Sequence, residues 1–437
     1  MRSEVRGPVD VRARQRIRRR ILPYLFLLYV IAYLDRVNVG YAALQMTGDL
    51  HLTPDKFGFG VGIFFWGYFL LEIPGTILVE KWSARKWMAR IMISWGLIAM
   101  LMGFIHTSKQ FYWARLLLGA AEAGFFPGMV VYLSHWFRSE DRARAMAFFM
   151  AAQPISNIVG SPISGVLLGL NWLGMAGWRW LFVIEGIPAV IFGVVTLFYL
   201  TDWPHEAHWL EEDERQWISS ELEREKQTKL LTHSYSAWQA LRQPTVILLV
   251  IAYFCMNMSI YGVNFWLPTI LKKLSGYSDL IITLVTSLPY CVGLIAILLI
   301  GWSSDRTRER RWHTALPILA LSLGLGLSVT VENSTPLSVA MFSVAAIGMY
   351  GYIPCFWSLP TSFLTGTAAA ACIGLINSIG NLGGFVGPFV VGDLVKRTHS
   401  FASGILFLSL SALVAAGLIL SMRLTKHRKP VPAEAHA

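Results

Sequence analysis

Five ionisable residues stand inside long apolar runs of the sequence: Asp35, Arg36, Glu72, Arg115 and Glu122. A charged side chain at the centre of a bilayer costs roughly 2.5 to 3.5 kcal/mol on insertion scales, so each is expected to have a partner or a task. A carboxyl group can carry a proton, and the planar guanidinium group of arginine binds a carboxylate through two parallel hydrogen bonds. Residues of these types are suited to handling a proton together with an organic anion.

Helix geometry gives three of these residues a depth. Asp35 lies 14 residues after its apolar run begins at Ile21, which is about 21 Å along a helix. Arg115 and Glu122 are seven residues apart, so they share one helix face, which we expect to line a cavity. Two structural explanations stay open. Asp35 with Arg36 or Arg115 would form an ion pair that locks two helices, and the small residues around Glu122 also suit close helix packing.

Three further acids have weaker cases. The position of Glu72 near the inner third of its run suits an interhelical hydrogen bond as well as a proton-carrying group. Glu185 and Asp393 lie near the outer ends of their runs, where we expect solvation and a structural role. None of the ten histidines lies in the interior of a run, which leaves proton movement to carboxyl groups.

The composition indicates what must position these residues. The chain has 437 residues, of which 55% are hydrophobic and only 14% charged, with a mean hydropathy of +0.52. Soluble proteins carry about 25% charged residues, so the chain is predicted to be an all-α membrane protein. Apolar runs long enough to span a bilayer fall at 21–41, 57–79, 87–106, 111–133, 143–168, 180–201, 245–271, 280–301, 314–331, 337–363, 368–394 and 401–422.

These twelve runs form two sets of six. We predict a basic tail at 1–20, a first half at 21–201, a linker at 202–244, a second half at 245–422 and a tail at 423–437. Of the 37 Lys and Arg, 28 fall in segments on the side of the termini, seven on the other side and two within runs. Because basic loops stay in the cytoplasm, both termini are predicted to be cytoplasmic.

Repeated motifs relate the two halves. The loop with Glu80, Lys81 and Arg85 is matched at an offset of 225 by one with Asp305, Arg306 and Arg310. Phe126-Pro127 and Ile353-Pro354 repeat at 227, and so do Gly160 with Gly165 and Gly387 with Gly392. Matches in consecutive order predict twelve transmembrane helices as two pseudo-symmetric six-helix bundles, the arrangement of transporters that move around a central site.

Several segments resemble the major facilitator superfamily (MFS). The acidic-basic loops resemble its signature between helices two and three and the weaker copy between helices eight and nine. Further matches are YLDRVNVG from Tyr33, GYFLLEIPG from Gly67, RLLLGAAEAGFFPG from Arg115 and WRWLFVIEGIP from Trp178. They are similar to the anion:cation symporter branch, especially bacterial carriers for tartrate and sugar acids. Thr76 and Ser83 depart from the pattern, since the superfamily loop usually has Gly there.

The resemblance implies roles for matching residues. Asp35 and Glu122 match protonation sites of similar carriers, and the two acidic-basic loops match gating loops. Asn377 is a looser match to a substrate position, and five residues match positions implicated in substrate contact or the proton-linked network: Tyr33, Arg36, Tyr68, Arg115 and Gln153. The implied activity is proton-coupled symport of a small hydroxylated organic anion, such as tartrate or a sugar acid, across the bacterial inner membrane by a monomer in contact with lipid.

Alternatives differ in substrate or in class. Most aromatic residues suit an interfacial belt or helix packing, but six in the second half leave open a pocket for an aromatic acid of the phthalate or hydroxyphenylacetate type: Tyr253, Tyr261, Trp266, Tyr350, Tyr352 and Trp357. Efflux of a cationic drug fits two buried arginines less well. An intramembrane enzyme would need a deep histidine or an activated nucleophile, and a sensor would carry a soluble domain.

Other functions lack their usual signals. The four cysteines lie in apolar runs without C-x-x-C spacing, and no disulfide or metal site is expected. The chain has no G-x4-G-K-[ST] loop, so ATP does not drive it directly and no cofactor is expected. The net charge of +11 is spread over loops rather than one solvated face, which argues against nucleic acid as a partner.

Overall fold

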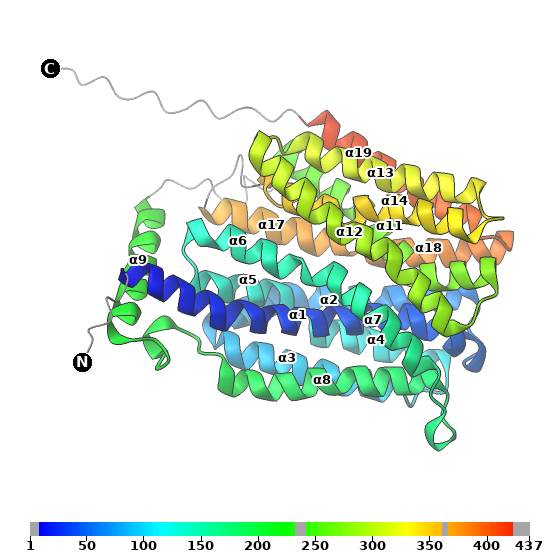
Figure 1. The fold of residues 1–437 in the computed structure, drawn as a ribbon, viewed down its shortest axis with the longest axis horizontal. Helices are drawn as coiled ribbons and strands as arrows, with labels where there is room; N and C mark the ends of the chain where they lie inside the picture. The colour runs from blue at the N-terminus through cyan, green and yellow to red at the C-terminus, as the bar shows by residue number, and fades with distance from the viewer. Residues whose placement is uncertain (1–7, 232–241, 361–365, 423–437) are drawn as a thin grey trace, which may run out of the picture.

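The computed structural model describes residues 8–231, 242–360 and 366–422, together with most of their side chains. Within these ranges the chain forms helices and no strands, which confirms the all-α prediction (Figure 1). The helices of the first half are α1 Val9–Asp49, α2 Pro54–Lys81, α3 Ala84–Met102, α4 Ser108–Glu122, α5 Phe125–Trp136, α6 Ser139–Met150, α7 Ala152–Leu168 and α8 Gly177–Tyr199.

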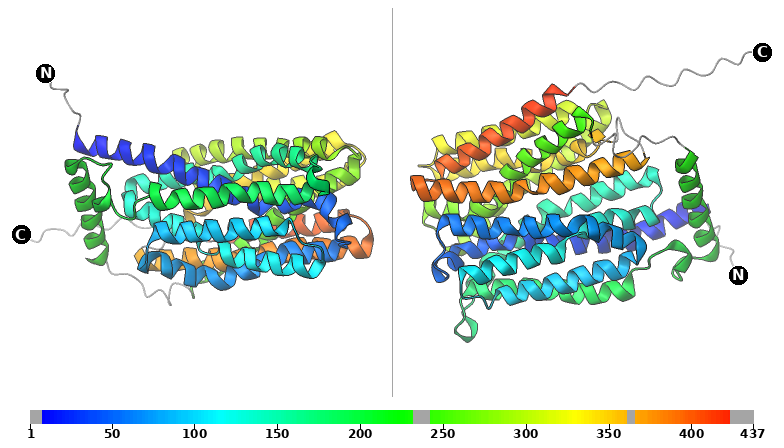
Figure 2. Two further views of the ribbon diagram at one scale, coloured as in Figure 1. Left: turned by 90° about the horizontal axis from the view of Figure 1, so that it is seen from below. Right: turned by 180° about the vertical axis from the view of Figure 1, so that it is seen from behind.

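The second half follows a helix that lies across one end of the bundle, α9 Glu212–Leu231 (Figure 2). Its helices are α11 Pro244–Ser275, α12 Asp279–Thr307, α13 Arg311–Thr330, α14 Thr335–Gly351, α15 Ile353–Phe356, α17 Gly366–Asn381, α18 Gly383–Thr398 and α19 Ala402–Ser421. Nine helical stretches of the described residues are long and apolar enough to cross a membrane, and α2, α3 and the α6–α7 pair run alongside them. Twelve spans result.

Some spans are interrupted where the sequence predicts one continuous run. In the fourth span α4 ends at Glu122, and Gly124 has φ +82° before α5 begins. A residue with a side chain avoids this left-handed conformation, so glycine permits the break. The tenth span is interrupted at the repeat-related position, between α14 and α15, where Pro354 follows. The Phe126-Pro127 and Ile353-Pro354 repeat therefore marks matching interruptions.

Repeat-related glycines occupy equivalent positions in the two halves. A Cβ on Gly160 of α7 would lie 2.2 Å from Leu34 of α1, and one on Gly387 of α18 would lie 2.1 Å from Met258 of α11. Since α1 and α11 are the first helices of their halves, the same helix pair is packed closely in each. This equivalence supports the pseudo-symmetry that the sequence predicts.

The other two repeat-related glycines lie where the halves meet. A Cβ on Gly165 of α7 would lie 1.9 Å from the hydroxyl oxygen of Thr283 on α12. One on Gly392 of α18 would lie 2.3 Å from the carbonyl oxygen of Pro54 on α2. Both contacts lie toward the end of the bundle that is remote from the described N-terminus, at the right of Figure 1.

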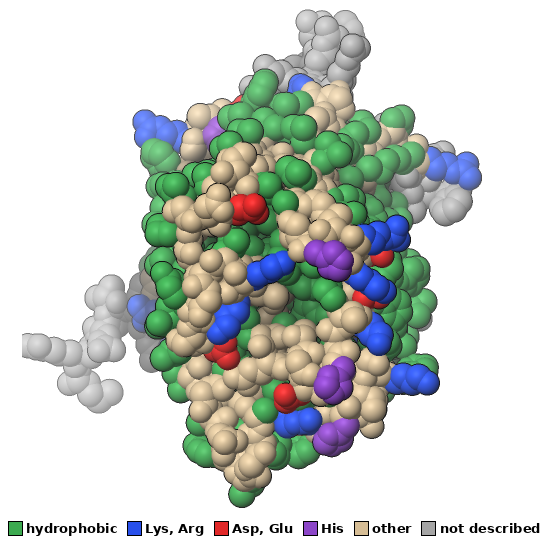
Figure 3. All heavy atoms as spheres, turned by 90° about the vertical axis from the view of Figure 1, so that its right-hand side faces the viewer, with side chains coloured by type: hydrophobic (Ala, Val, Ile, Leu, Met, Phe, Trp, Pro, Cys, Tyr) green, Lys and Arg blue, Asp and Glu red, His purple; other side chains and the backbone are tan. Residues whose placement is uncertain are grey.

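Polar contacts join the halves at this remote end. Lys396 and Asp55 form an ion pair with 2.9 Å between Nζ and Oδ2, and the Gln45 amide donates to Asp279 at 3.0 Å. Figure 3 shows this end face-on, with basic and acidic side chains interspersed among hydrophobic ones. We call the contacts of α2 with α18 and of α12 with α1 and α7 at this end the remote seam.

The basic N-terminal segment differs from the expected tail, because α1 begins at Val9 and runs without interruption into the first span. Arg12 and Arg16 are one turn apart and face α9. Arg12 pairs with Asp213 at 2.5 Å, and Arg16 pairs with Glu211 and Glu214 at 2.8 Å each. These ion pairs hold the extension of α1 beside α9 (Figure 2).

Candidate functional site

A small central cavity lies between the two halves. Its volume is about 40 Å³, which is room for about three water molecules. Side chains from α1, α2, α5, α6 and α7 line one side and side chains from the second half line the other. The lining residues are Tyr29, Tyr33, Arg36, Tyr68, Phe126, Met150, Gln153, Tyr253, Asn257, Ile260, Tyr261, Met349, Tyr350, Tyr352, Ile353, Trp357, Asn377 and Asn381.

Arg36 joins this cavity to a buried acid. Its Nη2 donates to Oε1 of Glu122, and the two side chains are 11% and 3% exposed. Its Nη1 lies 3.5 Å from the hydroxyl of Tyr261 on α11, and its guanidinium carbon lies 5.4 Å from the centre of the Tyr68 ring. The guanidinium group thus has one side on the cavity and the other on Glu122. Removing either partner of a buried ion pair leaves an uncompensated charge, so each of these two groups depends on the other or on a replacement of the same charge.

Asp35 points elsewhere. Its side chain is 2% exposed and accepts a hydrogen bond from the Asn38 amide at 3.2 Å. Among the described side chains, no cation lies within 4 Å of its carboxylate. The suggested ion pairs of Asp35 with Arg36 or Arg115 are therefore wrong for this structure. Arg36 is the next residue of the same helix and faces another direction, and Arg115 on α4 donates to the Val61 carbonyl instead.

Arg115 lies behind the cavity rather than in its wall. The residue is fully buried, donates from Nη2 to the Val61 carbonyl at 3.3 Å, and stacks over the Phe64 ring at 4.8 Å. Its Nε and Nη1 have no hydrogen-bond partner in the described part of the chain. Arg115 and Glu122 share the α4 helix, but only Glu122 contacts a residue of the cavity wall.

Glu72 links the halves near the cavity. The Asn377 amide of α17 donates to its Oε1, and the Ser378 hydroxyl donates to Oε2 at 2.8 Å. Of the two roles open to Glu72, the interhelical hydrogen bond is present. Asn377 also lines the cavity, so it connects the cavity wall to α2 of the other half.

Glu185 contradicts the expectation of a solvated acid. It is only 8% exposed and accepts a hydrogen bond from Ser164 at 3.1 Å. The reason is that α8 begins at Gly177, so Glu185 lies two turns inside the helix rather than at its edge. Asp393 is one-third exposed and pairs with Arg397 at 2.8 Å, as a surface acid would.

Uncharged residues complete the cavity wall. Gln153 donates to the Tyr29 hydroxyl at 2.6 Å, and Asn157 donates to the Tyr350 hydroxyl across the halves at 3.1 Å. The sequence analysis missed Tyr29. Its spacing of four and seven residues before Tyr33 and Arg36 places all three on one helix face and was the available signal.

The proposed aromatic pocket forms only in part. Tyr253, Tyr261, Tyr350, Tyr352 and Trp357 all line the cavity. Trp266 is not among the lining residues. Its indole nitrogen donates to the Pro388 carbonyl of α18 at 3.1 Å, and its ring centre lies 5.0 Å from that of Phe57 on α2.

The two repeated loops make different contacts. Arg85 reaches the end of α8, where its backbone nitrogen donates to Asp202 at 2.8 Å. Arg310 pairs within its own loop with Asp305 at 2.7 Å, and Arg306 stacks on Trp302. The side chains of Glu80 and Lys81 lie outside the described residues.

No cluster of three or more His, Cys, Asp or Glu side chains among the described residues could hold a metal ion.

Comparison with known proteins agrees with this architecture. Residues 25–388 match the Major Facilitator Superfamily. A protein of Agrobacterium vitis named "Putative tartrate transporter" is 44% identical over 418 residues, which covers 95% of this chain and 96% of that protein. A protein of Acinetobacter baumannii named "Quinolone resistance transporter" is 41% identical over 403 residues, with 92% of each chain covered.

A solved structure shows the same fold. The xylose transporter XylE from E. coli, in a partially occluded inward open conformation, superimposes with a TM-score of 0.74 at 15% identity, covering 93% of this chain and 99% of that one. The family match and the relatives named as transporters define a multi-pass membrane transporter rather than an enzyme. The chain belongs to the Major Facilitator Superfamily.

Proposed function

We propose that this transporter carries a small hydroxylated organic anion, such as tartrate or a sugar acid, together with protons. One observation carries the proposal: Arg36 has its guanidinium group on the central cavity and its ion-pair partner, Glu122, behind it. An anion that enters the cavity meets a cation already paired with a titratable acid. The relative named for tartrate, similar over nearly the full length of both chains, supports the substrate class.

Competition for Arg36 would couple the two solutes. A substrate carboxylate binds the guanidinium group in place of Glu122, and the released, buried Glu122 carboxylate then takes up a proton, because a buried charge without a partner is unfavourable. By reciprocity, protonation of Glu122 favours anion binding by the same factor. The contacts favour Glu122 as the acid in this competition, because it is the acid that pairs with Arg36. Asp35 is proposed as a second protonation site.

Polar groups around Arg36 would recognise the hydroxyl groups of the substrate. Tyr33, Tyr68, Gln153 and Asn377 line the cavity and carry both donors and acceptors. Arg115 contributes from behind the cavity, where its positive charge balances the buried acids. A cavity of about 40 Å³ is too small for an acid of ten or more heavy atoms, so binding requires the side chains or the two halves to move apart.

Alternating access would then use both ends of the bundle. The remote seam holds the halves together beyond the cavity, so the cavity is expected to open next toward the end that carries the termini. The excess of Lys and Arg on that side favours cytoplasmic termini, and we propose the bacterial inner membrane as the location. One chain supplies the whole cavity, as a monomeric carrier requires. The loops with Arg85 and Arg310 are proposed as gating loops.

The five aromatic side chains that the second half contributes to the cavity wall favour one alternative substrate class, an aromatic carboxylate of the phthalate or hydroxyphenylacetate type. Such a substrate would use the same arginine for its carboxylate and stack its ring on tyrosine or tryptophan.

Uptake into proteoliposomes tests the proposed function. Purified carrier is reconstituted, and entry of labelled tartrate, galactonate and phthalate is measured with and without an inward proton gradient. We expect one hydroxylated acid to accumulate about tenfold or more above its equilibrium level when the gradient spans one pH unit, since one coupled proton supplies about 1.4 kcal/mol per unit. Equal entry with and without the gradient for every acid would rule out proton symport.

A further inference from the structure

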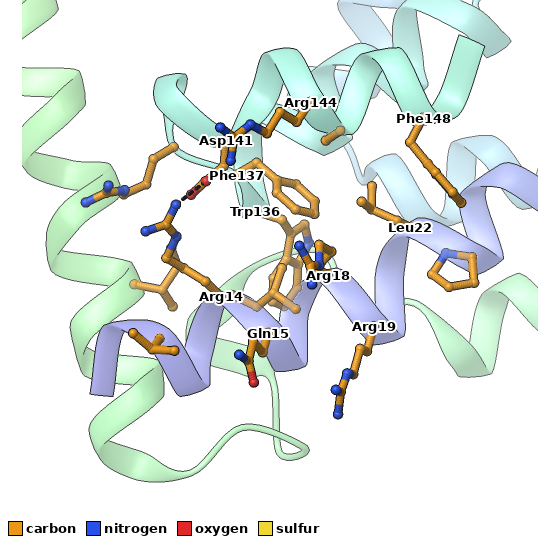
Figure 4. Close-up of a pocket in the computed structure, with 16 residues that line it drawn as sticks. Arg14, Gln15, Arg18, Arg19, Leu22, Trp136, Phe137, Asp141, Arg144 and Phe148 are labelled. Carbon is orange, nitrogen blue, oxygen red and sulfur yellow. Dashed lines mark hydrogen bonds and ion pairs between the residues drawn. The ribbon is translucent and has the colours of Figure 1, made fainter. Parts of the chain in front are cut away.

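A second cavity lies at the end of the bundle that carries the termini, apart from the central site. It has a volume of about 590 Å³ and lies between the N-terminal part of α1, the end of α5, α6 and α9 (Figure 4). Nothing in the proposed transport cycle uses it. Its wall combines two chemistries, because five arginines and one aspartate share it with aromatic and aliphatic side chains.

The arginines fall into two groups. Arg14 pairs with Asp141, the one acid of the wall, as the dashed line in Figure 4 marks. Arg138 pairs with Glu140 and, at 2.9 Å, with Glu221. The other three, Arg18, Arg19 and Arg144, are exposed and have no ion-pair partner among the described residues. Arg18 and Arg19 come from α1 and Arg144 comes from α6, so unpaired positive charge borders the cavity on two sides.

The wall formed by Leu22, Trp136 and Phe148 is apolar and lies next to the start of the first membrane span. Leu22 and Trp136 are buried in it, and Phe148 is 45% exposed at its edge. The Phe148 ring packs on Phe26, and Leu27 beside it is 37% exposed on the outer surface of α1. Arg18 and Arg19 lie three and two residues before the apolar run that starts at Ile21. The charged rim therefore lies at the depth of lipid headgroups, and the apolar slot lies at the depth of acyl chains.

We propose that this cavity binds an anionic phospholipid of the leaflet on the side of the termini. The lipid phosphate lies between Arg18, Arg19 and Arg144, and an acyl chain lies along Leu22 and Phe148. Basic pockets between transmembrane helices are a recurring means of holding anionic headgroups. A free phosphate would use the rim but not the apolar slot, and a zwitterionic lipid would use the slot without neutralising the rim. The chain's own ends at 1–7 and 423–437 carry more basic than acidic residues, so their charge does not complement the arginines.

The bound lipid would fasten the extension of α1 to α6. This extension is also held to α9, through the ion pairs of Arg12 and Arg16. Three unpaired arginines lie close together at the rim, and their like charges repel one another. The negative charge of the lipid phosphate offsets this repulsion. This inference does not depend on the substrate of the carrier.

Lipid binding by the purified full-length carrier in neutral detergent tests the proposal. Fluorescent-acyl phosphatidylglycerol is titrated with protein and followed by anisotropy. Removing two cations from the rim with R18Q/R144Q should weaken binding about thirtyfold, given the usual contribution of a basic residue near an anionic lipid. The control K226Q/R308Q removes two exposed charges elsewhere and should bind as the unmodified chain does. Melting temperatures of both variants verify that each is folded.

Competition identifies the chemistry of the occupant. Unlabelled phosphatidylglycerol should displace the probe, whereas phosphatidylcholine and glycerol phosphate should do so only at much higher concentrations. Equal binding by R18Q/R144Q and its control would overturn the proposal. So would equal displacement by phosphatidylcholine, which shows that charge is not recognised, or by glycerol phosphate, which shows a site for small soluble anions.

Discussion

Substitution of Glu122 by glutamine is expected to make substrate binding independent of pH and to abolish accumulation driven by a proton gradient. The glutamine side chain resembles the protonated acid, because it is neutral and cannot hold Arg36 as an ion pair. The anion then no longer competes with a carboxylate of the protein for the guanidinium group. Exchange of labelled for unlabelled substrate across the membrane needs no net proton movement, so exchange should persist in this variant.

The expected size follows from the coupling between the two solutes. Site couplings are typically worth 1 to 3 kcal/mol, so the affinity of the unmodified carrier should fall by about 5- to 150-fold as the pH rises through the titration, and that of E122Q by less than about twofold. Binding of the transported acid is measured between pH 5 and 8, alongside exchange and gradient-driven uptake.

A matched control is Glu185→Gln. Glu185 is also a buried acid, but it lies on α8 and accepts a hydrogen bond from Ser164 rather than from Arg36. The control should keep the pH dependence of binding. If E122Q keeps this dependence as well, Glu122 is not the acid that competes for Arg36, and the proposed coupling is wrong.

Substitution of Gly392 by leucine is expected to open the remote seam and to slow transport. A Cβ at this position would lie 2.3 Å from the backbone carbonyl oxygen of Pro54, and a backbone atom cannot turn aside as a side chain can. Overpacking of this kind costs about 1 to 3 kcal/mol, which shifts an equilibrium between two arrangements of the halves by roughly 5- to 150-fold. Transport needs both arrangements, so uptake should fall with the population of the closed seam.

Distance measurements detect the opening. Spin labels at Lys109 and Glu332, two exposed positions at the remote end of different halves, are placed in a variant without the native cysteines. In G392L the distance between the two labels should lengthen relative to the parent variant. The control Gly48→Leu introduces the same side chain where a Cβ meets nothing within 4 Å. It should change neither the label-to-label distance nor uptake. Unchanged distances in G392L together with normal uptake would show that the seam is not part of the transport cycle.

The fold was predictable because its main signals are long and repeated. A bilayer requires about 20 apolar residues per helix, and twelve such runs with a charge bias between loops leave few alternatives. The repeated glycines indicated more than the number of helices. Two of them, Gly165 and Gly392, lie at contacts between the two halves.

The partners of individual side chains were not predictable in the same way. Adjacent residues such as Asp35 and Arg36 point about 100° apart on a helix, and which of them meets α4 depends on how the helices rotate against each other. Sequence spacing cannot supply this rotation. The interruption at Gly124 was equally hidden, because a run of Gly and Ala is compatible with a continuous helix and only the backbone angle of +82° reveals the break.

Burial was predictable to within about one turn of a helix. Glu122 and Arg115 were correctly placed inside the protein, whereas Glu185 was assigned to the solvated edge because its helix starts three residues earlier than its apolar run. An error of this size matters little for a leucine, but it changes an exposed acid into a buried one.

Proton uptake on substrate binding tests the central claim most directly. The purified carrier, in weakly buffered solution with a pH indicator, is mixed with the acid identified by the proteoliposome assay, and the protons taken up per bound anion are counted. Competition between Glu122 and the substrate for Arg36 predicts uptake of about one proton per anion near the midpoint of the pH dependence, and none from this position in the E122Q variant. Full binding of the anion without any proton uptake by the unmodified carrier would contradict the account.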